Sequence, residues 1–300
     1  MTTVQRTVPN GSIDLAVFES GNPDGPTVVM VHGWPDTHEL WAGVSQHLAR
    51  DFRLVSYDTR GAGASTVPER TEAYRLEALA TDLFAVIDAV SPHEPVHVLA
   101  HDWGSVEAWE AVCEPAARDR ILSFTSISGP NLDHLATWGR RRIAERRFGG
   151  PLSQVVASAY TVAFQIPGVA RLPLELWFSK HWPRFLGFFD GLDPQVVRPA
   201  PTLSRDMVNG LKRYRANIRP RLKSPRVRRT NVPVQLILNR RDKAVRPAGY
   251  EDAEEWAPHL RRNSLDAGHW SPLSHADDIA RLAADFIESV ESDRHRSESA

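Results

Sequence analysis

The chain has 300 residues, of which 42% are hydrophobic and 24% are charged, with a formal net charge of -1. This composition is typical of a folded globular protein, and the single cysteine excludes an internal disulfide framework and favours a reducing compartment. The start lacks an apolar signal segment, and no run approaches the ~20 apolar residues that span a bilayer, so we expect a cytoplasmic protein without an integral membrane segment.

The first part of the chain alternates short apolar runs with patterns of helical period. Strands are predicted at residues 4–8, 13–19, 27–31, 53–57, 96–99 and 121–127, and helices at residues 40–48 and 76–87. Such alternation predicts an α/β protein with a mostly parallel sheet that helices cover on both faces.

The pattern changes in residues 131–230, which are rich in Arg, Trp and Phe and predict helices without strands. After this segment we expect strands at 233–238 and 263–265, helices at 247–256 and from 271 through 290, and a frayed polar tail at 291–300. We therefore divide the chain into a core, residues 1–130 and 231–300, and a helical cap, residues 131–230. The cap would lie above the carboxyl ends of the strands, where parallel sheets bind ligands.

The predicted cap is strongly basic. It carries 19 Lys and Arg against 6 Asp and Glu, a net charge of +13, and the remainder carries 17 against 31, a net charge of -14. These charges indicate either solvated helix faces or a surface that attracts anionic lipids, anionic substrates or a partner. The segment matches no nucleic-acid recognition motif, so we expect no nucleic-acid partner.

Asp102 is the leading candidate for chemistry. It follows an apolar strand and precedes a helical pattern, in the order Ala100-His101-Asp102-Trp103-Gly104. A small residue two positions before and after a nucleophile is typical of the sharp strand-to-helix turn known as a nucleophile elbow. A carboxylate in place of the usual serine points to attack on a saturated carbon, with an alkyl ester of the enzyme as the intermediate.

Two further residues complete a candidate triad with Asp102. Asp242 follows a predicted strand, and His269 lies between the last strand and the last helix, after Gly268. The chain order of nucleophile, acid and histidine is that of α/β-hydrolases. We expect His269 to be the general base and Asp242 to orient it.

Four motifs together resemble those of epoxide hydrolases with the α/β-hydrolase fold. In chain order they are His32-Gly33-Trp34-Pro35, the segment from Tyr57 to Ser65, His101-Asp102-Trp103-Gly104, and Gly268-His269-Trp270. The resemblance implies an eight-stranded sheet, a helical cap after the sixth strand and a cis peptide bond between Trp34 and Pro35. The chain departs from the usual pattern at Ala100, where the family usually has Gly, and at Ser274, where it often has Glu.

The cap favours an epoxide substrate. Tyr160 and Tyr214 lie in segments that resemble those carrying the two cap tyrosines of epoxide hydrolases, and the chain has only five tyrosines. An epoxide oxygen leaves as a strongly basic alkoxide, so opening the ring requires a proton donor, and phenols remain protonated at neutral pH. The alternative is that both tyrosines only pack the cap.

The resemblance implies the remaining roles. Backbone N–H groups of Trp34 and Trp103 would form the oxyanion hole, and Trp34, Trp103, Phe164 and Trp270 would line the substrate pocket. We expect neither a metal nor an organic cofactor: His97 and His101 are four residues apart, but without a clear companion carboxylate.

The segment from Ser128 to Leu135 and the arginines after Trp138 resemble the hydrolase half of bacterial proteins that fuse an epoxide hydrolase to a short-chain dehydrogenase. That resemblance implies apolar or lipid-like epoxides as substrates, and the basic, aromatic cap suits weak contact with anionic lipid. A homodimer is left open. The rival interpretations are a haloalkane dehalogenase, which shares the Asp-Trp pair, and a catalytically silent ligand-binding protein on the same scaffold.

Overall fold

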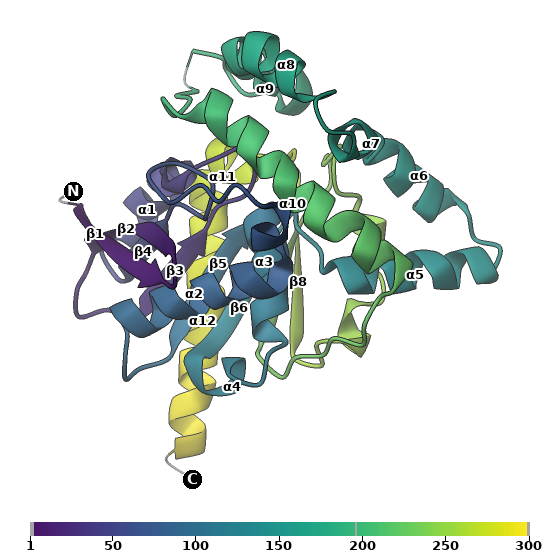
Figure 1. The fold of residues 1–300 in the computed structure, drawn as a ribbon. Coiled ribbons are helices and arrows are strands. Elements are labelled where there is room, and N and C mark those ends of the chain that lie inside the picture. Colours follow the sequence, from purple (N-terminus) through teal and green to yellow (C-terminus); the bar gives the residue numbers. More distant parts are fainter. Residues whose placement is uncertain (1–2, 196, 299–300) are drawn as a thin grey trace.

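The computed structural model describes residues 3–195 and 197–298. It contains one eight-stranded sheet in the order β1-β2-β4-β3-β5-β6-β7-β8 (Figure 1). The strands are β1 (Val4–Asn10), β2 (Ile13–Gly21), β3 (Thr27–Val31), β4 (Arg53–Tyr57), β5 (Val96–His101), β6 (Ile121–Ile127), β7 (Val234–Asn239) and β8 (Leu260–Leu265). The first two pairings along the sheet are antiparallel and the others are parallel. The predicted mostly parallel eight-stranded sheet is confirmed.

Helices cover both faces of this sheet because its central strands are apolar on both sides. In β3, Val28 and Met30 face the layer formed by α1 (Ala42–Leu48) and α12 (Ala276–Glu298). Val29 and Val31 face the layer of α2 (Leu76–Val90) and α3 (Trp103–Val112). Each face therefore has its own hydrophobic core, as continuous apolar strands predict.

The described residues between β6 and β7 form helices and no strand. These helices are α5 (Leu132–Ala144), α6 (Gly149–Ala157), α7 (Tyr160–Gln165), α8 (Arg171–Pro173), the π-helical turn η3 (Leu174–Phe178), α9 (Ser179–Asp190) and α10 (Leu203–Lys223). Figure 1 shows them along one side of the sheet, with α10 crossing between the outer helices and the core. This is the helical insertion expected after the sixth strand; the division into two domains at residues 131 and 230 stays a prediction.

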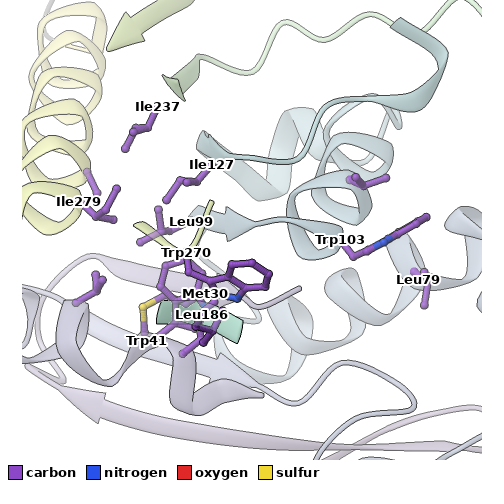
Figure 2. Packing of buried hydrophobic residues seen from close by; sticks show 14 of the residues in the cluster. Met30, Trp41, Leu79, Leu99, Trp103, Ile127, Leu186, Ile237, Trp270 and Ile279 are labelled. Carbon is purple, nitrogen blue, oxygen red and sulfur yellow. The ribbon is translucent and has the colours of Figure 1, made fainter. Parts of the chain in front are cut away.

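The cap helices share a core with the body. Leu186 of α9 and Leu211 of α10 belong to the same buried cluster as Met30 and Leu99. Figure 2 shows this cluster, with Trp270 and Leu186 close to Met30 and Trp41. Burial of apolar surface therefore helps to hold the insertion over the carboxyl ends of the strands.

Four local predictions need correction. The single helix expected from residue 271 through 290 is two helices, α11 (Ser271–Ser274) and α12 (Ala276–Glu298). The expected helix at 247–256 is two separate 3-10 turns, η4 (Pro247–Tyr250) and η5 (Ala253–Glu255). The last strand begins at Leu260 instead of residue 263. The tail expected to fray is helical through Glu298, where helix formers and an i,i+3 ion pair between Arg296 and Asp293 extend α12; the last two residues lie outside the described part.

The remaining short helical elements are η1 (His38–Trp41), η2 (Thr71–Tyr74), α4 (Ala117–Arg120) and α11 (Ser271–Ser274). Of these, η1 directly follows the His32-Gly33-Trp34-Pro35 motif and α11 directly follows Trp270. Both therefore lie at the end of the sheet where the candidate site is built.

Candidate active site

Asp102 occupies a sharp turn between β5 and α3. Its φ is 51° and its ψ is -125°, a conformation that residues other than glycine rarely adopt. Two main-chain hydrogen bonds hold the turn, from the Asp102 N–H to the Ile127 carbonyl and from the Val106 N–H to the Asp102 carbonyl, each 3.0 Å long. The turn directs the carboxylate outward at the carboxyl end of the sheet, as expected for an elbow.

Glycines make room for this turn. A Cβ atom on Gly33 would lie 2.3 Å from the Asp102 Oδ1 atom, and one on Gly104 would lie 2.4 Å from the carbonyl oxygen of His32. Both distances are far shorter than real contacts, so the loop after β3 and the elbow approach each other only because these positions lack side chains. Ala100 is fully buried.

The structure brings the three candidate triad residues together. The Nε2 atom of His269 lies 3.4 Å from Asp102 Oδ2, and its Nδ1 atom lies 2.9 Å from Asp242 Oδ2. The other Asp242 oxygen accepts the backbone N–H groups of Ala244 at 2.7 Å and Val245 at 2.9 Å. His269 and Asp242 are buried, so the imidazole is fixed between two carboxylates.

These contacts set the charge of the site. Burial disfavours the charged imidazole, but the carboxylates of Asp242 and Asp102 outweigh it and raise the pKa of His269 well above its usual value. Burial likewise disfavours the charged form of Asp242, yet His269 and the Val245 N–H lower its pKa. The two carboxylates therefore favour the charged form of His269 in the free protein.

One predicted oxyanion donor contacts the nucleophile directly. The Trp34 N–H donates to Asp102 Oδ1 over 2.7 Å. The Trp103 nitrogen is the first of α3 and lies on the same side, because a Cβ on Gly33 would come within 2.7 Å of it. The peptide bond between Trp34 and Pro35 is cis, as expected.

Tyr160 and Tyr214 lie over the elbow from the cap. The Tyr214 ring packs edge-on against Trp103 at 4.8 Å between centroids, and the Tyr160 ring lies 6.3 Å from the Tyr214 ring. Burial and the nearby Asp102 carboxylate raise the pKa of Tyr160. Burial, Tyr160 and Asp102 raise the pKa of Tyr214 in the same way, so both phenols keep their protons beside the nucleophile.

The other expected pocket residues surround this group. Phe164 stacks edge-on with Tyr214 at 5.0 Å and with Trp34 at 5.3 Å. Trp270 packs against Trp182 of α9 at 5.2 Å. A cavity of about 420 Å³ lies beside Trp182 and is lined by Pro35, Asp36, Leu40, Leu186 and Leu273 among others; Asp102 and the two cap tyrosines are not among its lining residues.

Two acidic residues at the site were missed by the sequence analysis. Asp36 accepts the Trp270 indole N–H over 3.0 Å, and burial raises its pKa to about 7. Asp190, the last residue of α9, accepts the backbone N–H of His269 over 2.8 Å and also that of Trp270. A Cβ on Gly268 would collide with the Asp190 carboxylate at 2.3 Å, which explains the glycine before the histidine. Asp36 follows a recognised motif directly, whereas no local signal marks Asp190.

Part of the basic charge of the cap is used in contacts with the core. Arg213 of α10 donates to the Arg60 carbonyl at 3.0 Å and lies 3.3 Å from Glu107 of α3. Glu110 of α3 pairs with Arg221, Arg226 and Arg228. Arg141 and Arg142 of α5 both pair with Asp252, which lies between η4 and η5. Opposite charges on the two parts of the chain therefore hold them together, which the sequence alone did not distinguish from solvated helix faces.

Among the described residues, no group of three or more His, Cys, Asp or Glu side chains could hold a metal ion. The two histidines considered from the sequence are engaged elsewhere: His97 contacts Ser123 and Glu291, and His101 contacts the His269 carbonyl. Within the same described part, no helix is both long enough and apolar enough to cross a membrane.

Comparisons with known proteins agree with this architecture. A family described as alpha/beta hydrolase fold matches residues 26–148. The probable oxidoreductase EphD of Mycobacterium tuberculosis is 44% identical over 288 residues, covering 93% of this chain and 48% of that protein. Epoxide hydrolase A of the same organism is 33% identical over 191 residues, covering 63% of this chain and 55% of that protein. The chain thus spans about half the length of the curated relatives it matches.

A solved structure resembles the whole chain. The crystal structure of the Bacillus megaterium epoxide hydrolase with an inhibitor has a TM-score of 0.76 at 19% identity, covering 94% of this chain and 100% of that one. At this identity the likeness establishes the fold alone.

Proposed function

This chain is an α/β-hydrolase-fold protein related to epoxide hydrolases, and from that premise we propose that it converts an epoxide to a vicinal diol. The observation that carries the proposal is a carboxylate at the elbow, Asp102, placed between the His269–Asp242 pair and two protonated phenols. A serine hydrolase needs no such phenols, and a halide leaving group needs no proton.

The first step forms an ester. An oxygen of the Asp102 carboxylate attacks one epoxide carbon, a new C–O bond forms, and the ring C–O bond at that carbon breaks. Tyr160 and Tyr214 bind the departing oxygen, and one of them gives it a proton. The ionised carboxylate needs no base for this step, and the positive end of α3 favours its charge.

The second step hydrolyses the ester. Esterification removes the negative charge of Asp102, so the pKa of His269 falls and its proton passes to the phenolate left by the first step, which leaves a neutral imidazole that can act as a base. His269, oriented by Asp242, then takes a proton from water, whose oxygen attacks the ester carbonyl carbon. The N–H groups of Trp34 and Trp103 stabilise the resulting oxyanion. Collapse of this intermediate breaks the bond between the carbonyl carbon and the ester oxygen. The proton of the added hydroxyl passes to the departing alkoxide, which completes the diol, and Asp102 is again a carboxylate beside protonated His269.

The indole groups argue against the dehalogenase alternative. Halide release in such a site needs free N–H donors, yet the Trp34 indole donates to the Met207 carbonyl over 3.0 Å. The Trp103 indole packs edge-on against the Tyr214 ring at 4.8 Å between centroids. The Trp34 indole is therefore not free for a halide without rearrangement of the cap.

We propose small apolar or lipid-like epoxides as substrates, because aromatic rings pack together beside Asp102. Both proposed steps use only side chains of this chain, backbone N–H groups and water. The name of EphD includes an oxidoreductase activity, but no dinucleotide-binding fingerprint occurs in this chain, and we do not extend that activity to it.

The decisive experiment traps the ester. His269→Gln should still form the ester but not hydrolyse it, so intact-protein mass should rise by the mass of one epoxide, with the adduct on the peptide carrying Asp102. Asp102→Ala should acquire no adduct. Halide release from a bromoalkane would instead establish the dehalogenase, and the absence of an adduct with aryl, terpenoid and fatty acyl epoxides would support a silent binding protein.

A further inference from the structure

The outer edge of the cap exposes a series of large apolar side chains. They follow one another through α6, α7, α8 and η3, which Figure 1 shows running along the rim of the molecule. The members are Leu152, Val155, Val156, Val162, Ile166, Val169, Leu172, Leu176 and Trp177, each at least half exposed. Soluble surfaces rarely carry so many large apolar side chains in succession without a partner.

The spacing of these residues gives each helix one apolar solvent face. Leu152, Val155 and Val156 are separated by three and four residues, and Leu172 and Leu176 by four, so each set lies on one side of its helix. The opposite sides are already packed: Gln154 and Leu174 are buried against the rest of the protein. Core packing therefore does not explain the exposed faces.

A basic groove adjoins this apolar edge. It has a volume of about 760 Å³ and is lined by Gly168, Arg171, Glu175, Pro201, Ser204, Arg205, Val208, Asn209, Leu211, Lys212 and Arg215. Arg171 and Glu175 alternate with the exposed Leu172 and Leu176 on the same turns, so the groove and the apolar edge share one stretch of chain.

Two cations of the groove lack a carboxylate partner among the described residues. Lys212 donates to the Pro68 carbonyl over 2.7 Å and Arg215 to the Phe164 carbonyl over 2.7 Å. Partial burial lowers the pKa of both side chains, which indicates that their positive charge is poorly solvated. An anionic group in the groove would relieve this cost.

We propose that this face of the cap docks on an anionic lipid surface, with phosphate headgroups in the groove and the apolar edge inserted among the acyl chains. An interfacial surface of this kind combines apolar side chains and an aromatic residue, here Trp177, with basic residues beside them. Lys180 and Arg184 of α9 add exposed positive charge nearby.

Charge argues for lipid over a second copy of the chain. A twofold dimer interface pairs a patch with the same patch of the second copy, so the basic groove of one copy would face the basic groove of the other, and their charges would repel. A lipid surface offers the opposite charge to every cation at once. The inference does not depend on the proposed hydrolase activity, since it concerns binding alone.

The test measures binding of the purified chain to sedimented vesicles of phosphatidylcholine, with and without phosphatidylglycerol. We expect binding only when phosphatidylglycerol is present, and weaker binding as salt is raised. The variant Leu172→Ser with Leu176→Ser should bind at least about tenfold more weakly, because inserted apolar area is lost. Lys180→Gln with Arg184→Gln should also weaken binding, and more so at low salt.

Matched variants separate docking from general surface effects. Val4→Ser with Val227→Ser removes equally exposed apolar side chains away from the cap edge and should bind as the parent does. Thermal melting of all variants checks that they fold. Absence of parent binding to phosphatidylglycerol vesicles would overturn the proposal, as would a parent dimer that the Leu172 and Leu176 variant converts to a monomer, which would show that a second copy covers this face.

Discussion

At the scale of single residues, the two phenols and the nucleophile form one electrostatic unit. The Asp102 carboxylate raises the pKa of both Tyr160 and Tyr214, so the charge that we propose attacks the substrate also keeps the two phenols protonated. In the proposed mechanism this charge disappears on ester formation, which makes the phenols better acids and lets His269 become neutral, the form in which it can accept a proton from water.

Loss of either phenol should slow ester formation. We expect Tyr160→Phe and Tyr214→Phe each to lower the rate of the first step about 100-fold, and the double variant more, because the alkoxide would leave without a proton. Single-turnover mass spectrometry of the ester measures this rate. Tyr74→Phe removes a buried hydroxyl whose partner is Pro68 and should leave it unchanged; undiminished ester formation in the double variant would contradict the mechanism.

We expect Asp190 to act as a positioning residue for His269. Its carboxylate accepts two successive N–H groups of the histidine loop, and an amide can accept only one of them in this geometry. We expect Asp190→Asn to slow ester hydrolysis about tenfold while ester formation changes little, because only the second step depends on the aim of the imidazole. Asp193→Asn, an exposed acid just beyond α9, is the control. Equal slowing of both steps would indicate a general loss of structure instead.

At the scale of elements, α10 joins the cap to the body through buried charge. The Arg213 guanidinium lies among Thr59, Arg60 and Glu107. Burial raises the pKa of Glu107 to about 7, although Arg213 opposes this. Burying the Arg213–Glu107 pair costs desolvation free energy. Removing one partner costs more, because the remaining charge is then buried without compensation.

Removal of the arginine should therefore destabilise the protein strongly. We expect Arg213→Met to lower the free energy of unfolding by about 2–4 kcal/mol, less than for a permanently charged carboxylate because Glu107 can take up a proton. Urea denaturation measures the change. Arg219→Met, on an exposed position of the same helix, should change it by less than about 0.5 kcal/mol, and a similar loss in both variants would refute the assignment.

The same pair predicts a pH effect of definite sign. A carboxyl whose pKa is raised on folding binds more protons in the folded state, so its contribution to stability is lost as pH rises from about 4.5 to about 7. Glu107→Gln removes this titration. The stability of the parent relative to Glu107→Gln should accordingly fall across that range, by at most about 1.4 kcal/mol per pH unit, in urea denaturation at a series of pH values. A difference that rises or stays flat would show that Glu107 remains ionised throughout.

At the scale of the whole molecule, the positive charge is concentrated in the cap segment and the negative charge in the rest of the chain, and the two parts pack together. A segment of net charge +13 lies on a remainder of net charge -14, and many of the resulting pairs are partly exposed, such as Arg226 with Glu77 and Arg141 with Glu255. Attraction across the junction should therefore depend on ionic strength, as it does for exposed charges in general.

We expect sodium chloride to weaken the union of cap and core. Between about 0.01 M and 0.5 M salt the free energy of unfolding should fall by about 1–2 kcal/mol, and amide exchange in α10 should rise first. The variant Arg141→Gln with Arg226→Gln should show a shallower dependence, since fewer pairs remain to be screened. Stability that increases steadily with sodium chloride would count against this picture.

The sequence by itself determined what depends on local order. The apolar runs fixed the strands and their two-sided burial, and the small residues around Asp102 predicted the sharp turn that the φ of 51° shows. The sequence also predicted that Asp102, Asp242 and His269 lie close together, because each follows a strand and parallel strands bring these ends to one edge of the sheet. The predictions of a helix at 247–256 and of a frayed tail at 291–300 were wrong. Local residue preferences differ little between 3-10 turns, frayed ends and regular helix, so sequence places helix ends poorly.

Only the tertiary structure decided which distant charges meet. Nothing near Asp190 in the sequence marks it as the acceptor for a loop 79 residues away. Likewise, Arg213 cannot be told from the other arginines in the sequence, and only the packing of α10 places it beside Glu107 of α3. Neighbours along the chain set local conformation, whereas long-range polar contacts depend on how whole elements pack. The same packing decided which cap side chains are buried around Tyr214 and which, such as Leu172 and Leu176, remain exposed.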